Sequence, residues 1–127
     1  MKRILLLEDD RQVAFSWQTK LEELGYYVAH ETRVEPAIAA IDTAPFDLVI
    51  IDILIRDRED RISDKGGFSL LSHIALNIKV RPKIIAVSGG DTKLHLLKHA
   101  EILRADRTLR KSVSAEELVQ VTEELLR

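Results

Sequence analysis

The sequence predicts an α/β fold in which a doubly wound parallel sheet of five strands is flanked by five helices. Three short apolar runs are continuous rather than alternating, which is typical of strands buried on both faces of a parallel sheet. Segments with the helical spacing of apolar residues lie between these runs. Strands that alternate with helices along a chain indicate right-handed crossovers and one parallel sheet.

The strands are expected at five places. The three strong apolar runs cover residues 4–7, 48–51 and 84–87. Two weaker candidates, at residues 27–29 and 108–109, have an apolar signal too short to predict a strand alone. They complete the alternation of strands with helices.

The first helix is expected from the spacing of Val13, Trp17, Leu21 and Leu24, and it should end at Gly25, because glycine is common just after a helix. Proline fits the first turn of a second helix over residues 36–41. The last helix should begin after Ser114, which forms a capping box with Glu117. Two more helices are expected over residues 68–74 and 92–103.

Length and composition indicate one domain over residues 1–127, with 46% of the residues apolar. The 19 basic and 21 acidic residues create no strong field that would attract nucleic acid or a membrane. The absence of cysteine excludes disulfides and thiolate metal sites. The first apolar run is too short for a signal peptide or a membrane span. We therefore expect a cytoplasmic protein without direct nucleic-acid or membrane binding.

One segment departs from this alternation. Eight of the ten residues from 56 to 65 are charged, with the signs balanced, which predicts a long solvated loop. The segment is either an inert insertion or a recognition loop beside the active site, since long loops are often functional.

Side chains that can take part in catalysis or ligand binding follow four of the predicted strands. The carboxyl ends of parallel strands share one edge of the sheet, and ligands bind in the crevice outside that edge. Carboxylates, a hydroxyl and an ammonium should therefore meet there. In chain order these residues are Glu8, Asp9, Asp10, Asp52, Ser88 and Lys111.

Clustered carboxylates without thiols or paired imidazoles favour a hard cation such as Mg²⁺. A cation also relieves the repulsion between neighbouring carboxylates. With Mg²⁺ and Lys111 neutralising phosphoryl oxygens, and Ser88 donating a hydrogen bond to one of them, a carboxylate can attack phosphorus and form an acyl phosphate.

At these positions the sequence resembles the receiver domains of response regulators in two-component signalling, which have a flavodoxin-like fold. Residues 5–9, Leu-Leu-Leu-Glu-Asp, are similar to the family's strand that ends in an acidic pair. Residues 48–52, Leu-Val-Ile-Ile-Asp, are similar to the strand that ends in the phosphoacceptor. Residues 85–89, Ile-Ala-Val-Ser-Gly, and Lys111 are similar to the family's hydroxyl and lysine motifs.

The resemblance implies a role for each of these residues. Asp52 would accept a phosphoryl group from a histidine kinase or a phosphotransfer protein, which makes the domain a self-modifying phosphoacceptor rather than a turnover enzyme. Asp9 and Asp52 would bind Mg²⁺ directly, Glu8 would act mainly through water, and the backbone carbonyl of Leu54 would add a ligand. The separation of Asp9 from Gly25 matches the family's spacing, which leaves Asp10 as an extra acid. The downstream partner is not predicted.

The sequence departs from the family pattern at several places. Gly67, the glycine that matches the family's, comes fifteen residues after Asp52 rather than about eight. Ser112 replaces the proline after the lysine, so the Lys111–Ser112 bond is expected to be trans. Thr108 stands where the family has a switching aromatic residue, and Arg104 replaces a glycine that follows the fourth helix.

Three other interpretations remain open. The first is a pseudo-receiver that binds a partner without phosphorylation, which the departures favour. The second is a flavodoxin-like nucleotide or flavin binder, although no glycine-rich loop follows the first strand. The third assigns each site residue an ordinary role, as a helix cap or a surface charge. The histidines at 30, 73, 95 and 99 are scattered, and surface or packing roles are expected for them.

Overall fold

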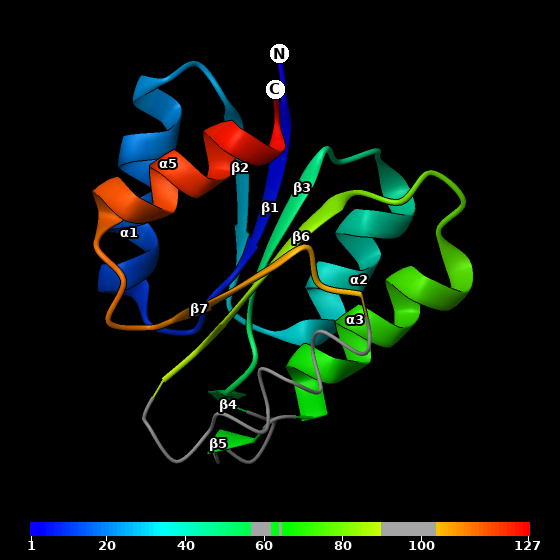
Figure 1. Ribbon diagram of the computed structural model, residues 1–127. Helices are drawn as coiled ribbons and strands as arrows, with labels where there is room; N and C mark the ends of the chain where they lie inside the picture. Colours follow the sequence, from blue (N-terminus) through cyan, green and yellow to red (C-terminus); the bar gives the residue numbers. More distant parts are fainter. Residues whose placement is uncertain (57–61, 64, 90–103) are drawn as a thin grey trace.

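The computed structural model describes residues 1–56, 62–63, 65–89 and 104–127 (Figure 1). Five parallel strands form one sheet in the order β2-β1-β3-β6-β7. The predicted doubly wound parallel sheet is therefore confirmed. Its strands are β1 (Arg3–Leu7), β2 (Tyr27–Glu31), β3 (Leu48–Asp52), β6 (Lys83–Ser88) and β7 (Arg107–Arg110).

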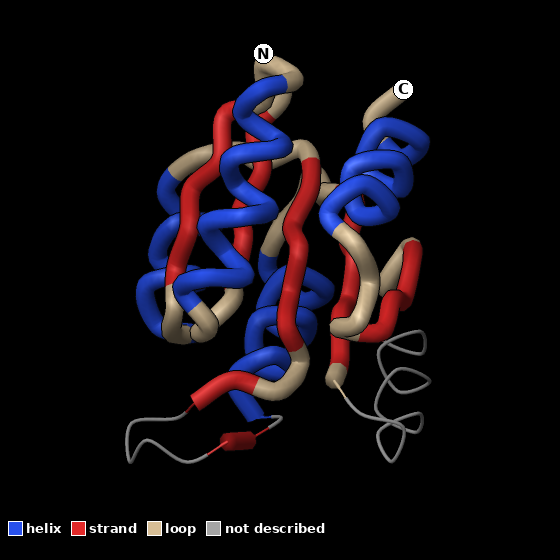
Figure 2. Tube along the Cα trace, turned by 90° about the vertical axis from the view of Figure 1, so that its left-hand side faces the viewer, coloured by secondary structure: helices blue, strands red, loops and turns tan. Residues whose placement is uncertain are grey.

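Helices cover both faces of the sheet. Helices α1 (Arg11–Glu23) and α5 (Ala115–Leu125) lie side by side on one face, and α2 (Val34–Thr43) and α3 (Lys65–Asn77) lie side by side on the other. Figure 1 shows the sheet between these two helical layers, and Figure 2 views it from the side of α1 and α5. The remaining predicted helix, over residues 92–103, falls outside the described residues. None of the described helices is long and apolar enough to cross a membrane.

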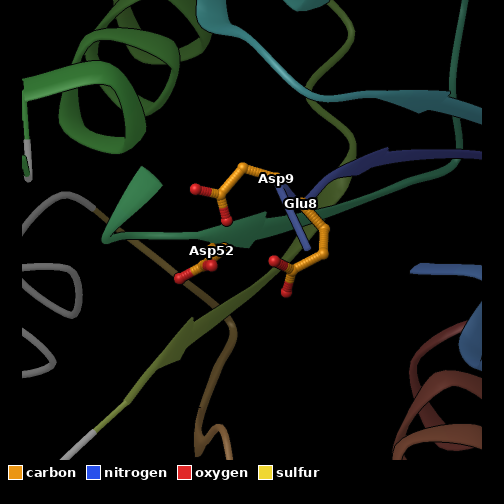
Figure 3. Close-up of side chains that lie close together, drawn as sticks. All are labelled: Glu8, Asp9 and Asp52. Atoms are coloured by element: carbon orange, nitrogen blue, oxygen red, sulfur yellow. The ribbon is translucent and has the colours of Figure 1, made fainter. Parts of the chain in front are cut away.

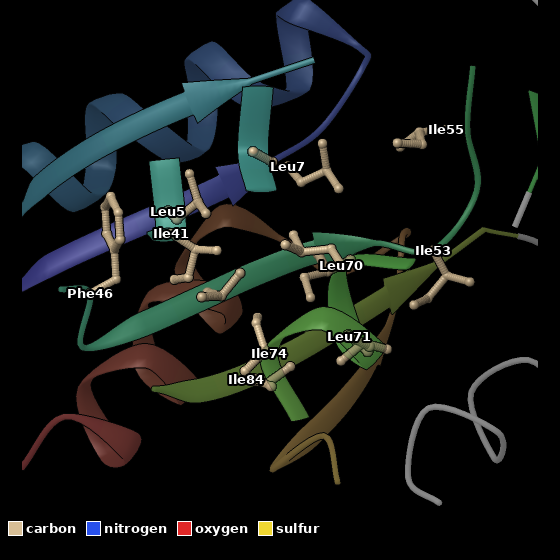
Figure 4. Close-up of a cluster of buried hydrophobic side chains, with 14 residues drawn as sticks. Leu5, Leu7, Ile41, Phe46, Ile53, Ile55, Leu70, Leu71, Ile74 and Ile84 are labelled. Carbon is tan, nitrogen blue, oxygen red and sulfur yellow. The ribbon is translucent and has the colours of Figure 1, made fainter. Parts of the chain in front are cut away.

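The continuous apolar runs fill two separate cores, one on each face of the sheet. Leu5 and Leu7 of β1 point toward α2 and α3, where they join a cluster with residues of β3 and β6 (Figure 4). Ile4 and Leu6 point the opposite way and pack with Trp17 and other residues of α1 and α5. Successive side chains of a strand alternate between faces, so a strand covered on both sides needs apolar residues throughout.

Local signals in the sequence fix the ends of the helices. The side chain of Ser114 accepts a hydrogen bond from the Glu117 amide, as the capping box predicts. Gly25 follows α1 with φ +91°, and its amide donates to the Glu22 carbonyl at 2.9 Å while the Tyr26 amide donates to Leu21 at 3.3 Å. These two bonds form a Schellman motif, which needs a residue with positive φ at that position.

At both ends of the charged segment after β3, the structure has strands or helix where the sequence predicts a loop. Strands β4 (Ile55–Arg56) and β5 (Ile62–Ser63) pair antiparallel, and α3 begins at Lys65 rather than at residue 68. Ile55 is buried in the α2 and α3 core, which anchors the hairpin to the domain. Residues 57–61 and 64 lie outside the described part, so the choice between an inert and a recognition loop stays a prediction.

Candidate functional site

The sheet register brings the predicted site residues to one edge. Asp52 is the last residue of β3 and pairs with Val87, which directly precedes Ser88 at the end of β6. Ser88 in turn pairs with Arg110 of β7, and Lys111 follows. Both views place this edge, with the β4–β5 hairpin, at the end of the molecule opposite the two termini (Figures 1 and 2).

Three carboxylates gather at this edge. Glu8 and Asp9 follow β1, and their side chains lie close to that of Asp52 (Figure 3). One carboxylate oxygen of each residue can be chosen so that all three lie within 4.8 Å of one another. Glu8 and Asp52 are almost completely buried, with exposed fractions of 0% and 1%, and Asp9 is half-buried. Burial of Asp52 excludes its interpretation as a solvated surface charge.

Lys111 joins two of the buried carboxylates. Its Nζ donates to Glu8 Oε2 and to Asp52 Oδ2, each at 2.8 Å. The backbone also holds this residue, because the Lys111 amide donates to the Ser88 carbonyl at 2.9 Å. The Lys111–Ser112 bond is trans, as predicted. The lysine thus reaches Asp52 although Ser112 replaces the family's proline.

Burial and charge perturb the protonation of these groups. Burial first, and the neighbouring charge of Asp52 second, raise the pKa of Glu8 to about 8, against the opposing hydrogen bond from Lys111. Burial also raises the pKa of Asp52, and the Lys111 hydrogen bond limits the rise. Burial alone would lower the pKa of Lys111, but its bonds to Asp52 and Glu8 raise it. One ammonium can neutralise only one of the two carboxylates, so Glu8 stays largely protonated near pH 7, and a bound cation would favour its ionised form.

Two buried oxygen atoms at the site point to a ligand. Glu8 Oε2 accepts from the Asp10 amide at 2.9 Å, and Asp52 Oδ1 accepts from the Leu54 amide at 3.1 Å. By contrast, Glu8 Oε1 and Ser88 Oγ have no hydrogen-bond partner among the residues that the structure describes. Buried polar atoms are almost always hydrogen-bonded, so a bound group would satisfy these two. An all-oxygen donor set with net negative charge suits Mg²⁺.

Asp10 has a different role from its two acidic neighbours. Its Oδ1 accepts hydrogen bonds from the amides of Gln12 at 3.0 Å and Val13 at 3.2 Å, which caps the N-terminus of α1. The cluster of mutually close carboxylates contains Glu8 and Asp9 but not Asp10. Glu8 and Asp9 therefore lie beside Asp52, and their role as the metal-binding pair stays a prediction.

Gly67 explains how α3 approaches the end of β3. A Cβ atom at this position would lie 2.7 Å from Ile53 Cα and 3.1 Å from the Asp52 carbonyl oxygen. Only a residue without a side chain fits there, although the chain between Asp52 and Gly67 is longer than in the family pattern. The helix and the end of the strand are in direct backbone contact.

Sequence reasoning missed one residue at the site. The ring Nε2 of His30 lies 2.7 Å from the backbone carbonyl oxygen of Glu8. No apolar pattern predicts this contact, because it depends on the register that pairs His30 of β2 with Leu6 of β1. His73 instead contacts Asp42 of α2 at 2.7 Å, in line with a surface role. Residues 95 and 99 lie outside the described residues.

Fold and site together define a doubly wound α/β domain with an acidic cluster at the carboxyl edge of its parallel sheet. A model of the response regulator receiver domain matches residues 4–123, and the chain belongs to this family of two-component signalling proteins.

Relatives agree with this assignment. The chain is 28% identical over 128 residues to the probable transcriptional regulator ycf29 of Cyanophora paradoxa, covering 99% of the chain and 57% of that protein. It is 36% identical over 59 residues to the response regulator receiver protein CpdR of Brucella abortus, covering 46% of the chain and 49% of that protein. The matches span 24% to 57% of the length of these and a third curated relative.

Solved structures share the fold. A receiver domain from Methanospirillum hungatei is 27% identical with a TM-score of 0.80, and the match covers 98% of this chain and 94% of that one. A two-component response regulator from Clostridium difficile is 23% identical with a TM-score of 0.83, covering 100% and 97% of the two chains. At that identity the second match shows the fold alone.

Proposed function

We propose that this receiver domain accepts a phosphoryl group on Asp52 in a reaction that depends on Mg²⁺. The observation that carries the proposal is the buried Asp52 carboxylate, held by Lys111 at 2.8 Å, with Glu8 and Asp9 beside it. Glu8, Asp9, Asp52 and the backbone carbonyl of Leu54 would hold the metal. A bound Mg²⁺ neutralises charge on the phosphoryl oxygens.

In the proposed reaction an Asp52 carboxylate oxygen attacks phosphorus. The bond from phosphorus to the imidazole nitrogen of a phosphohistidine donor breaks, and the imidazole leaves with the electron pair. Lys111 donates to a phosphoryl oxygen and offsets its negative charge. Ser88 Oγ, which has no partner within the described residues, donates a hydrogen bond to another phosphoryl oxygen. Water later attacks phosphorus in the acyl phosphate and releases inorganic phosphate, which restores Asp52.

The proposal includes a donor and a setting. The donor is a histidine kinase or a phosphotransfer protein, the location is cytoplasmic, and residues 1–127 act as one receiver domain. The protein that reads the phosphorylated state is not identified by the site.

The test is incubation with acetyl phosphate and Mg²⁺, followed by intact mass measurement. We expect one added phosphoryl group, which disappears with chelator and is absent in Asp52→Asn. Asp42→Asn is a matched control, because Asp42 contacts His73 on the α2 and α3 side of the domain, and this variant should still be modified. A folded wild-type protein without added mass would favour a phosphorylation-independent binding module. Equal modification of Asp52→Asn would place the acceptor elsewhere.

A further inference from the structure

His30 makes a specific contact with the main chain of the acidic pair. It lies on β2 opposite Leu6 of β1, and its half-buried ring reaches past the end of β1 to the carbonyl oxygen of Glu8 at 2.7 Å. A carbonyl oxygen can only accept, so Nε2 carries the proton and donates. The contact is therefore a directed hydrogen bond from a ring to the peptide group that joins Glu8 to Asp9.

This bond is the second of two hydrogen bonds that hold the Glu8 main chain against β2. The amide of Glu8 donates to the Glu31 carbonyl at 3.0 Å, so β2 holds the residue on its N–H side. The His30 ring holds it on its C=O side. With the ring in place Glu8 has no exposed surface, so the ring supplies the directed donor that fixes this carbonyl. Without the ring, the carbonyl loses that fixed partner and is free to turn.

The peptide group between Glu8 and Asp9 sets the direction of both side chains. A rotation of that group moves the Cα–Cβ bonds on its two sides, and hence the two carboxylates that face Asp52 (Figure 3). A cluster whose oxygens lie within 4.8 Å of one another tolerates little displacement if it is to share one cation. The main-chain contact thus controls the geometry of the cation site.

We propose that His30 is a positioning residue that holds Glu8 and Asp9 in the arrangement that binds Mg²⁺. The inference rests on the proposed function, because it concerns the affinity of the same site. His30 contacts neither the cation nor the phosphoryl group; it acts through the Glu8 main chain. Residues that orient metal ligands typically change metal affinity by about 10- to 100-fold when replaced. We expect the low end of that range, since one hydrogen bond is lost and no ligand.

The test is Mg²⁺ titration of the full chain by calorimetry, with folding checked by circular dichroism. His30→Ala should weaken Mg²⁺ binding by about tenfold. His30→Gln should restore most of the affinity, because its terminal amide nitrogen occupies nearly the position of Nε2. His30→Asn ends too early to reach the carbonyl and should resemble alanine. His73→Ala, which removes a histidine away from the site, should bind Mg²⁺ as the wild type does.

The outcomes separate the inference from the proposed function. A wild-type protein that does not bind Mg²⁺ contradicts both. A wild type that binds, with His30→Ala equal to it, overturns only the positioning role. If the alanine variant does not fold, the glutamine and asparagine variants decide: equal affinity in these two overturns the inference, and loss in asparagine alone supports it.

Discussion

Gly67→Ala should push α3 away from the end of β3. The new Cβ would lie 2.7 Å from Ile53 Cα, 2.9 Å from the Ile53 carbonyl oxygen and 3.1 Å from the Asp52 carbonyl oxygen. Carbon atoms pack best at about 3.5 to 4.0 Å, so the two backbones must separate by about 1 Å. Overpacking of this kind lowers the free energy of unfolding by about 1 to 3 kcal/mol, and the higher helix propensity of alanine offsets at most about 1 kcal/mol of that loss. We expect a net loss of about 1 to 2 kcal/mol.

Gly66→Ala is the matched control in the same helix turn. Its Cβ would meet Ile55 Cδ1 at 2.8 Å and Cγ1 at 3.1 Å, which are side-chain atoms that can rotate away. We expect this variant to lose less stability than Gly67→Ala, because a side chain can shift more easily than a backbone. Urea denaturation, followed by the fluorescence of the buried Trp17, compares the two. Gly67→Ala as stable as Gly66→Ala would refute the argument. Slower modification of Gly67→Ala by acetyl phosphate should accompany its lower stability, because Asp52 belongs to the displaced backbone.

Three further predictions concern the acidic cluster and the backbone. Asp9→Ala should abolish most Mg²⁺ affinity without removing a cap, whereas Asp10→Ala should cost about 1 kcal/mol of stability and leave the affinity nearly intact; equal losses of affinity in a metal titration would mean that the register is wrong. Mg²⁺ binding at pH 7 should release close to one proton and tighten as the pH rises toward 8. The reason is that burial and the Asp52 charge raise the pKa of Glu8 to about 8, and the metal favours the ionised form of Glu8. Calorimetry in buffers of different ionisation heat measures the released protons, and no release would contradict the prediction. Arg104 has φ +70°, so Arg104→Gly should raise the free energy of unfolding by up to about 1 kcal/mol. Gly25→Ala, at φ +91°, should lower it by a similar amount. A lower melting temperature for Arg104→Gly, or a higher one for Gly25→Ala, would contradict this.

The sheet could be predicted from sequence to the extent that its strands are buried. The central strands β1, β3 and β6 are covered on both faces and read as continuous apolar runs. The weak candidates became β2 and β7, which are the two edges of the sheet. Their side chains are mostly half-buried or exposed, so they need fewer apolar residues and leave a shorter signal. The two-residue strands β4 and β5 are too short for any periodic pattern.

The side chains of the candidate site were easier to predict than the contacts that position them. Glu8 and Lys111 follow strands, Asp52 is the last residue of one, and the topology brings the carboxyl ends of the parallel strands to one edge. The contact of His30 with the Glu8 main chain depends on the register between β1 and β2. Apolar patterns do not determine that register residue by residue. The left-handed conformation of Arg104 was also hidden, because nothing about arginine itself favours positive φ.

The most direct test of the account is to locate the phosphoryl group within the chain. Protein treated with acetyl phosphate and Mg²⁺ is reduced with borohydride, which converts an aspartyl phosphate to homoserine, and the peptides are then sequenced by mass spectrometry. We expect homoserine at position 52 and nowhere else, with none formed when chelator is present. Homoserine at another aspartate, or a stable phosphoester on a hydroxyl side chain, would contradict the assignment of Asp52 as the phosphoacceptor.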